Sequence, residues 1–209
     1  MSSPAPDPKT LQDFLRSRAS IRTFSDQPVD GEVLERILET ACWAPSAHNR
    51  QPWRYLVLPD KKALARLVSA MAQDYQDALE RAGMSQDAIE QRIKKRSARI
   101  KGAAVGVVLC LCSEDMECYP EDAARQEGEE TMAVQSAALA GGQLLLAAHA
   151  EGLGAVWMGA PLFAQQAVRA SFGIPQSWQP QALILLGHPD EEPDGRQRKA
   201  LSEVVRYVE

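Results

Sequence analysis

The stretch RSRASIRTFSDQPVDGEVLERILETACWAPSAHNRQPWRYLVL, residues 16–58, holds two polar clusters separated by one predicted helix. The first cluster places Arg18, Ser20 and Arg22 at alternating positions. Alternation brings such side chains to one side of an extended segment, and a guanidinium binds a phosphate through two parallel hydrogen bonds. An ordinary basic loop shows the same pattern, so this cluster alone is a hypothesis for an anion site.

The second cluster, residues 44–53, is a polar loop between two prolines that leads into a predicted strand. Small and polar residues after a helix let the backbone approach a flat ligand, and the amides of Asn49 and Gln51 both donate and accept hydrogen bonds. A helix-to-strand connection rich in turn-forming residues has the same composition without any ligand. Because the clusters flank one helix, we predict that they form two halves of one site for an anion and a ring.

Hydrophobic periodicity predicts the other elements. Asp30 is the expected N-cap of the helix between the clusters, and the apolar run 103–112 predicts a central strand covered on both faces. We expect residues 1–8 to be loose and residues 1–209 to form one domain of the α+β class rather than a doubly wound sheet. Helices are expected at 9–18, 30–42, 61–82, 85–101, 121–151 and 163–172, with Gly83 between the third and fourth, and strands or extended segments at 53–58, 103–112, 155–158 and 181–187.

Composition narrows the class of protein. A formal net charge of −5 argues against a nucleic-acid binder, for which a basic stripe is expected. The four cysteines include no C-x-x-C pair, the three histidines lack metal-ligand spacing, and the sequence contains neither G-x-G-x-x-G nor G-x-S-x-G. Polar residues within the apolar stretch 133–150 argue against a membrane span. Residues 1–4 do not look like a signal peptide, so we expect a cytoplasmic protein.

Three motifs, in this order along residues 10–205, resemble the nitroreductase superfamily of FMN-dependent oxidoreductases. They are R-x-S-x-R followed by A-P-S-x-x-N-x-Q-P-W-R-Y, the segment GLGAVWMGAP at 152–161, and the basic segment RQRKAL at 196–201. The resemblance implies a nitroreductase-like fold, with a central, mainly antiparallel sheet flanked by helices. It also implies an intertwined homodimer with the flavin at the interface.

The same resemblance assigns candidate FMN-binding residues. The arginine cluster and the late arginines would serve the phosphate, the proline-flanked loop would lie against the ring, and the backbone of 157–159 would face the reactive N5 region. Two departures are Ala19, where relatives often carry a second arginine, and Ala200, where proline is common; the second leaves the register of the late arginines open. The candidates are Arg18, Ala19, Ser20, Arg22, Pro45, Ser46, Ala47, Asn49, Gln51, Trp157, Met158, Gly159, Arg196 and Arg198.

The expected activity is transfer of hydride or electrons from NADH or NADPH, through bound FMN, to a small electron-poor acceptor such as a nitroaromatic, a quinone or an enone. The flavin carries the chemistry, so no catalytic side chain and no metal is required. A ping-pong order is expected. Specialised relatives (reductases of deazaflavin-cofactor synthesis, reductive dehalogenases, flavin-consuming enzymes) and a non-catalytic flavin-binding protein are the alternatives. Residues 61–101 are either a specificity lid or a solvated helical pair, and His48 faces either solvent or substrate.

Overall fold

A computed structural model describes residues 6–193 and 197–208. The centre of this part of the chain is a four-stranded antiparallel sheet with strand order β1-β2-β4-β3. The inner strand β2 is buried along its whole length, which confirms the prediction of a central strand covered on both faces. The strands are β1 (Trp53–Leu58), β2 (Val105–Cys112), β3 (Gly154–Met158) and β4 (Trp178–Gly187).

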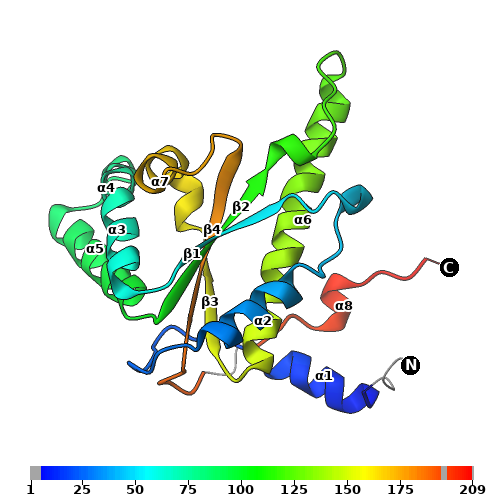
Figure 1. The fold of residues 1–209 in the computed structure, drawn as a ribbon, viewed down its shortest axis with the longest axis horizontal. Coiled ribbons are helices and arrows are strands. Elements are labelled where there is room, and N and C mark those ends of the chain that lie inside the picture. Colours follow the sequence, from blue (N-terminus) through cyan, green and yellow to red (C-terminus); the bar gives the residue numbers. More distant parts are fainter. Residues whose placement is uncertain (1–5, 194–196, 209) are drawn as a thin grey trace.

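Helices cover both faces of the sheet (Figure 1). Helices α2 and α6 pack on one face through residues such as Ile37 and Leu144. Helices α3 and α7 pack on the other through residues such as Leu64 and Val168. The helices are α1 (Pro8–Ser17), α2 (Gly31–Ala41), α3 (Lys61–Ala70), α4 (Ala72–Arg81), α5 (Gln86–Lys101), α6 (Ala123–Ala150), α7 (Gln165–Phe172) and α8 (Leu201–Val204), with 3₁₀ turns η1 (Ala47–Asn49), η2 (Ser113–Asp115) and η3 (Ala160–Phe163).

Among the described residues, α6 is the one helix long and apolar enough to span a membrane, with a window of mean hydropathy 1.3 that is 44% buried. Length and composition of a single helix are weak evidence for a span, because a core helix shares them. Leu144 and Ala148 of α6 are fully buried in the cluster that packs on the sheet. The contacts of α6 are therefore those of a core helix.

Most local predictions are confirmed, and two are wrong. Asp30 caps α2 by accepting a hydrogen bond from the Glu32 amide at 2.7 Å, and Gly83 separates α4 from α5 with a φ of 72°. The predicted helix 61–82 is instead two helices that meet at Met71. Met71 is 1% exposed, so the bend seats its side chain in the core while α4 leaves the sheet to pack on α5.

The N-terminal segment is the second correction. Pro8 begins α1, and the Asp7 carboxylate accepts a hydrogen bond from the Thr10 amide at 2.9 Å. Proline suits the first turn of a helix because the N–H that it lacks has no partner there. Asp7 and Pro8, expected to be loose, therefore belong to the start of α1; the rest of that expectation, residues 1–5, lies outside the described part of the chain.

Candidate functional site

The first polar cluster lies along the edge of the sheet beside β3. Ser20 forms a parallel bridge with Ala155, and the Ile21 amide donates a hydrogen bond to the Ala155 carbonyl at 3.0 Å. The side chain of Ile21 packs so closely on Gly154 that a Cβ there would lie 2.7 Å from it. Glycine at 154 therefore allows the chain carrying Arg18 and Arg22 to dock on the edge strand.

A cavity of about 710 Å³ opens beside this docked segment. The side chains of Arg18, Ser20, Arg22 and Arg198 all line it, although Arg198 is far away in the sequence. The Arg22 guanidinium donates to the Ser20 carbonyl at 3.1 Å, which orients it within the cluster. Arg16 and Ser17 also line it, so four arginines and two serines surround one cavity and supply the donor chemistry of a phosphate site. We call this space the arginine cavity.

Glu191, which sequence reasoning missed, also lines the arginine cavity. One carboxylate oxygen accepts hydrogen bonds from the amides of Arg22, at 2.5 Å, and Thr23, at 3.2 Å. The other oxygen accepts from the Thr23 hydroxyl at 3.1 Å. The Arg22 amide, followed by the contacts with Thr23, lowers the pKa of Glu191. Glu191 therefore fixes the backbone of the arginine cluster as an ionised carboxylate.

The proline-flanked loop has an unusual backbone. His48, Asn49 and Gln51 have φ values of 51°, 53° and 52°, in the left-handed region that residues other than glycine rarely adopt. The Gln51 amide donates to the Ser46 hydroxyl at 3.0 Å, which holds the loop in this shape. Backbone strain of this kind concentrates at binding and active sites.

Two contacts anchor the loop to the rest of the protein. The Ala47 amide donates to the hydroxyl of Ser136, a buried residue of α6, at 3.1 Å. The Arg50 guanidinium pairs with Glu117, which lies beyond the end of β2. Sequence reasoning missed Ser136 and Glu117, because each lies in another element and carries no motif signal. Pro45 and Ser46 precede the turn η1, so the predicted ring-facing residues sit on a fixed backbone.

One protomer does not bring the two predicted halves together. The loop contacts α6 at Ser136, whereas Ser17, just before the arginine cluster, forms a 2.8 Å hydrogen bond with His149 of α6. These contacts are thirteen residues apart, or about 20 Å along the helix axis. Of the described residues that line the arginine cavity, none belongs to the loop 44–53.

The third motif, Trp157 to Gly159, continues the same edge strand. The Ala155 carbonyl faces the open edge, where it binds Ile21. Backbone groups alternate in direction along a strand, so the Trp157 amide faces the same edge. The Trp157 ring packs over Gly141 of α6, where a Cβ would lie 2.3 Å from the indole.

Met158 and Gly159 line a second cavity, of about 480 Å³. Its other walls come from α4, α5 and η3. Gly159 follows the last residue of β3 and is four positions beyond Ala155, a distance of about 13 Å in extended backbone. The open edge of β3 thus runs from the arginine cavity to this second space, which we call the lid cavity.

The other candidates have structural roles or carry no site. His149 stacks on Phe14 with ring centroids 4.8 Å apart and its Nε2 forms a hydrogen bond with Ser17, so one ring face and one ring nitrogen help to pack α1 on α6. Cys110 and Cys112 are buried, as their alternation in an apolar run predicts. No group of three metal-ligating side chains occurs within residues 6–193 and 197–208. Arg196 lies outside the described residues.

Comparison with known proteins agrees with this geometry. The model of the nitroreductase family matches residues 15–188. YfhC of Bacillus subtilis (strain 168), whose name assigns it provisionally as an NAD(P)H nitroreductase, is 28% identical over 199 residues, which are 95% of this chain and 93% of YfhC. A protein of Desulfovibrio desulfuricans, provisionally described as a nitroreductase and solved in complex with FMN, is 26% identical with a TM-score of 0.72 and covers 98% of both chains.

The nitroreductase CinD of Lactococcus lactis, solved in complex with chloramphenicol, has a TM-score of 0.78 at 18% identity and covers 95% of this chain and all of CinD. At that identity the likeness concerns the fold. The family match, by contrast, includes the arginine cluster, the proline-flanked loop and the Trp157–Gly159 segment. The chain belongs to the nitroreductase family.

Proposed function

We propose that this protein is an FMN-dependent oxidoreductase that takes hydride from NADH or NADPH and reduces a small, planar, electron-poor acceptor. The observation that carries the proposal is the arrangement along β3. An arginine-lined cavity lies at one end of the open edge, and a cavity of small-molecule size lies at the other. The Desulfovibrio relative solved with FMN supports the cofactor, and CinD, solved with chloramphenicol, is an example of the same fold with a nitroaromatic ligand.

The arginine cavity fits the phosphate end of FMN. Arg18, Arg22 and Arg198 would hold the phosphate through charge-assisted hydrogen bonds, with the Ser20 hydroxyl as a further donor. FMN, when bound, supplies the hydride and electron transfer. The Trp157 amide, fixed by the strand, would donate a hydrogen bond toward the ring and stabilise negative charge that develops there.

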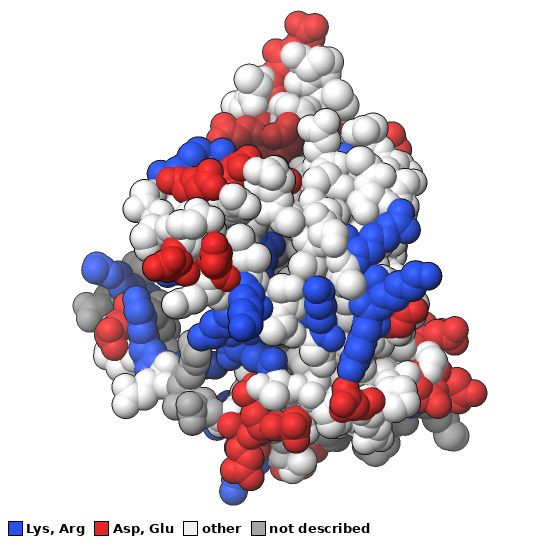
Figure 2. Space-filling view, turned by 90° about the vertical axis from the view of Figure 1, so that its left-hand side faces the viewer, with Lys and Arg blue, Asp and Glu red and all other residues white. Residues whose placement is uncertain are grey.

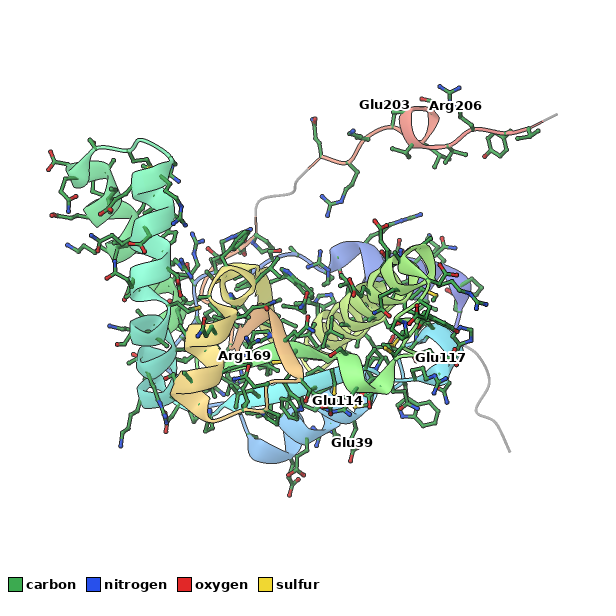
Figure 3. The ribbon with its side chains drawn as sticks, turned by 90° about the horizontal axis from the view of Figure 1, so that it is seen from above. Glu39, Glu114, Glu117, Arg169, Glu203 and Arg206 are labelled. Atoms are coloured by element: carbon green, nitrogen blue, oxygen red, sulfur yellow. The ribbon has the colours of Figure 1, made fainter. Side chains whose placement is uncertain are left out.

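We further propose that the active form is a homodimer in which the partner's proline-flanked loop completes the site. Within one protomer that loop lies about 20 Å from the arginine side along α6. Helix α6 exposes Val134 and Leu139, and the C-terminal arm, residues 197–208, stands apart from the helices and the sheet in Figure 3, where Glu203 and Arg206 mark it. The arm exposes four apolar side chains that a partner surface would cover: Leu201, Val204, Tyr207 and Val208.

The first test is an absorption spectrum of the purified protein with assay of the released cofactor. We expect a yellow protein that releases FMN, and light scattering at dimer mass. Arg22→Ala and Arg198→Ala should each weaken FMN retention by about 1.5–3 kcal/mol, the range for a hydrogen bond to a charged group. Arg92→Ala, which removes an exposed charge from α5, is the control. A colourless protein that FMN cannot reconstitute would refute the proposal, as would unchanged affinity in both variants.

The second test concerns turnover. Stopped-flow mixing with NADH and NADPH should bleach the flavin, and chloramphenicol or 1,4-benzoquinone should reoxidise it. A flavin that neither nucleotide reduces would instead favour a non-catalytic flavin-binding protein. Parallel lines in double-reciprocal plots are expected if the nucleotide leaves before the acceptor enters. Intersecting lines would contradict that order. We also place the protein in the cytoplasm, which fractionation of the source cells would check.

A further inference from the structure

The lid cavity contains a cation without a carboxylate partner. Arg96 of α5 lines it, together with Met71, Tyr75, Met158, Gly159 and Phe163. The carbon at the centre of the Arg96 guanidinium lies 3.9 Å from the centroid of the Tyr75 ring, and one terminal nitrogen reaches the Met71 sulfur at 3.8 Å. Thioether sulfur is a weak acceptor, and an aromatic face neutralises no charge.

This arrangement leaves most of the Arg96 donors available. A guanidinium has five N–H donors in one plane; at Arg96 one of them points to the Met71 sulfur, and Tyr75 engages the group through its ring face and a side-chain hydrogen bond, which leaves the remaining donors for a ligand. Asp74 is the carboxylate in the cavity lining, and within the described part of the chain it forms no ion pair with Arg96. Burial lowers the pKa of Arg96, and Tyr75 partly opposes that shift. The charged guanidinium has therefore lost part of its hydration without gaining a carboxylate partner among the described residues. An anion that entered the cavity would offset that loss.

The charge of helix α5, which carries Arg96, also favours an anionic ligand. Helix α5 carries six lysines and arginines against two acidic residues, in a chain whose net charge is −5. Figure 2 shows Lys and Arg side chains gathered in a band across the face that contains α3, α4 and α5. A positive surface around a cleft raises the local concentration of anions and speeds their association. The basic helix α5 therefore favours anionic ligands on its side of the cavity, whereas α4, on the other side, carries three acidic residues against one arginine.

We propose that the lid cavity binds planar aromatic acceptors that carry a carboxylate, and that Arg96 binds the carboxylate. The ring of such an acceptor would lie among the apolar side chains of Met71, Met158 and Phe163, next to the flavin-facing segment. A planar guanidinium and a planar carboxylate form two parallel hydrogen bonds, which fixes the orientation of the ring. The proposal rests on the proposed function for the position of the flavin, and it makes residues 61–101 a specificity lid.

The first experiment measures binding rather than turnover. Isothermal titration of the purified protein with benzoate and with benzamide, its uncharged isostere, compares the two ligands. We expect the wild type to prefer benzoate by at least about tenfold, the factor that corresponds to a charge-assisted hydrogen bond. Arg96→Gln should abolish the preference and Arg96→Lys should retain part of it. Arg92→Gln, which neutralises an exposed arginine on the same helix, should leave the preference for benzoate intact.

The second experiment measures kcat/KM for 4-nitrobenzoate and 4-nitrobenzamide, with the rate of flavin reduction by NADH and NADPH recorded separately. Arg96→Gln should lower kcat/KM for 4-nitrobenzoate at least about tenfold, while the amide and the nucleotide half-reaction change less than about twofold. Slower flavin reduction with an unchanged carboxylate preference would assign Arg96 to the nucleotide phosphates and overturn the proposal. So would equal binding of benzoate and benzamide by the wild type.

The two proposals fail separately. If the wild type is not reduced by either nucleotide, the proposed function fails, whereas the benzoate titration still decides whether Arg96 binds a carboxylate. If Arg96→Gln lowers the melting temperature, the ratio of the benzoate and benzamide affinities still tests the proposal, because a loss of folded protein lowers both affinities alike. The Arg96→Lys variant provides a second test. A folded Arg96→Gln variant that keeps the wild-type preference for benzoate would overturn the proposal.

Discussion

Gly141 of α6 leaves room for the Trp157 ring because glycine has no side chain. A Cβ at this position would lie 2.3 Å from the Trp157 indole and 2.9 Å from a methyl group of Leu109. Ordinary carbon contacts are about 3.5–4.0 Å, so both neighbours would have to move. Leu109 is fully buried in the inner strand β2 and has little room to do so. We therefore predict that Gly141→Ala displaces the Trp157 ring and destabilises the protein.

The size of the expected destabilisation can be isolated by comparison with a control substitution in the same helix. Gly128 is also in α6 but is exposed, and a Cβ there meets nothing within 4 Å. Gly128→Ala should stabilise the protein by about 0.5–1 kcal/mol, because alanine is the better helix former. Gly141→Ala has the same propensity gain but adds an overpacking cost of about 1–3 kcal/mol. The difference between the two variants isolates that cost.

Thermal unfolding of the two variants tests the reasoning. For a chain of this length, 1 kcal/mol corresponds to about 2–4 °C, so the melting temperature of Gly141→Ala should lie about 2–12 °C below that of Gly128→Ala. Indole fluorescence and near-UV circular dichroism should change in Gly141→Ala alone. Equal melting temperatures for the two variants would show that the Trp157 ring does not contact Gly141 closely in solution. The position of the edge strand β3 relative to α6 would then need revision.

Three further outcomes are expected. Gly154→Ala should loosen the docked segment that carries Arg18 and Arg22, because the new Cβ would lie 2.7 Å from Ile21. FMN retention should then fall several-fold while the far-UV circular dichroism stays unchanged. Unchanged FMN retention would contradict the role of the contact between Gly154 and Ile21. Glu191→Gln should lower the melting temperature at neutral pH. Because folding lowers the pKa of Glu191, its contribution is full above the ordinary value of 4.5 and is lost as pH falls through the lowered value, so the gap from the wild type should close in acid; a constant gap would refute this. Asp74→Asn should strengthen benzoate binding about two- to threefold by removing a repulsive surface charge, as titration would show.

Local features were predictable from the sequence because local chemistry determines them. An aspartate before an amphipathic run caps α2, and an apolar segment ended by proline forms β1. The division of the predicted helix 61–82 was not predictable in this way. No glycine or proline marks Met71, and its bend depends on a core that forms only in three dimensions.

The arrangement of the site was also not predictable from the sequence, because it depends on how distant segments lie in space. Two clusters that flank one helix look adjacent in the sequence, but α2 has eleven residues and is about 16 Å long. A helix of that length places the segments before and after it at its opposite ends. Glu191 and Arg96 escaped prediction for a related reason. Each acquires its role from a neighbour distant in the sequence, the Arg22 amide in one case and the Tyr75 ring in the other.

The open edge of β3 is the physical basis of the site that we propose, in which a ligand and a second copy of the chain meet. Unpaired strand edges attract other chains, and proteins usually cover them. Within the described residues, the segment 20–21 pairs with β3 at Ala155 alone, and the Trp157 amide lies farther along that edge, between the arginine cavity and the lid cavity. A ligand with a phosphate at one end and a flat hydrogen-bonding ring at the other matches that edge along its length. In the proposed site the outer face of that ring would lie bare in a single copy of the chain, and the strained loop 44–53, fixed about 20 Å away along α6, would reach that face from a partner.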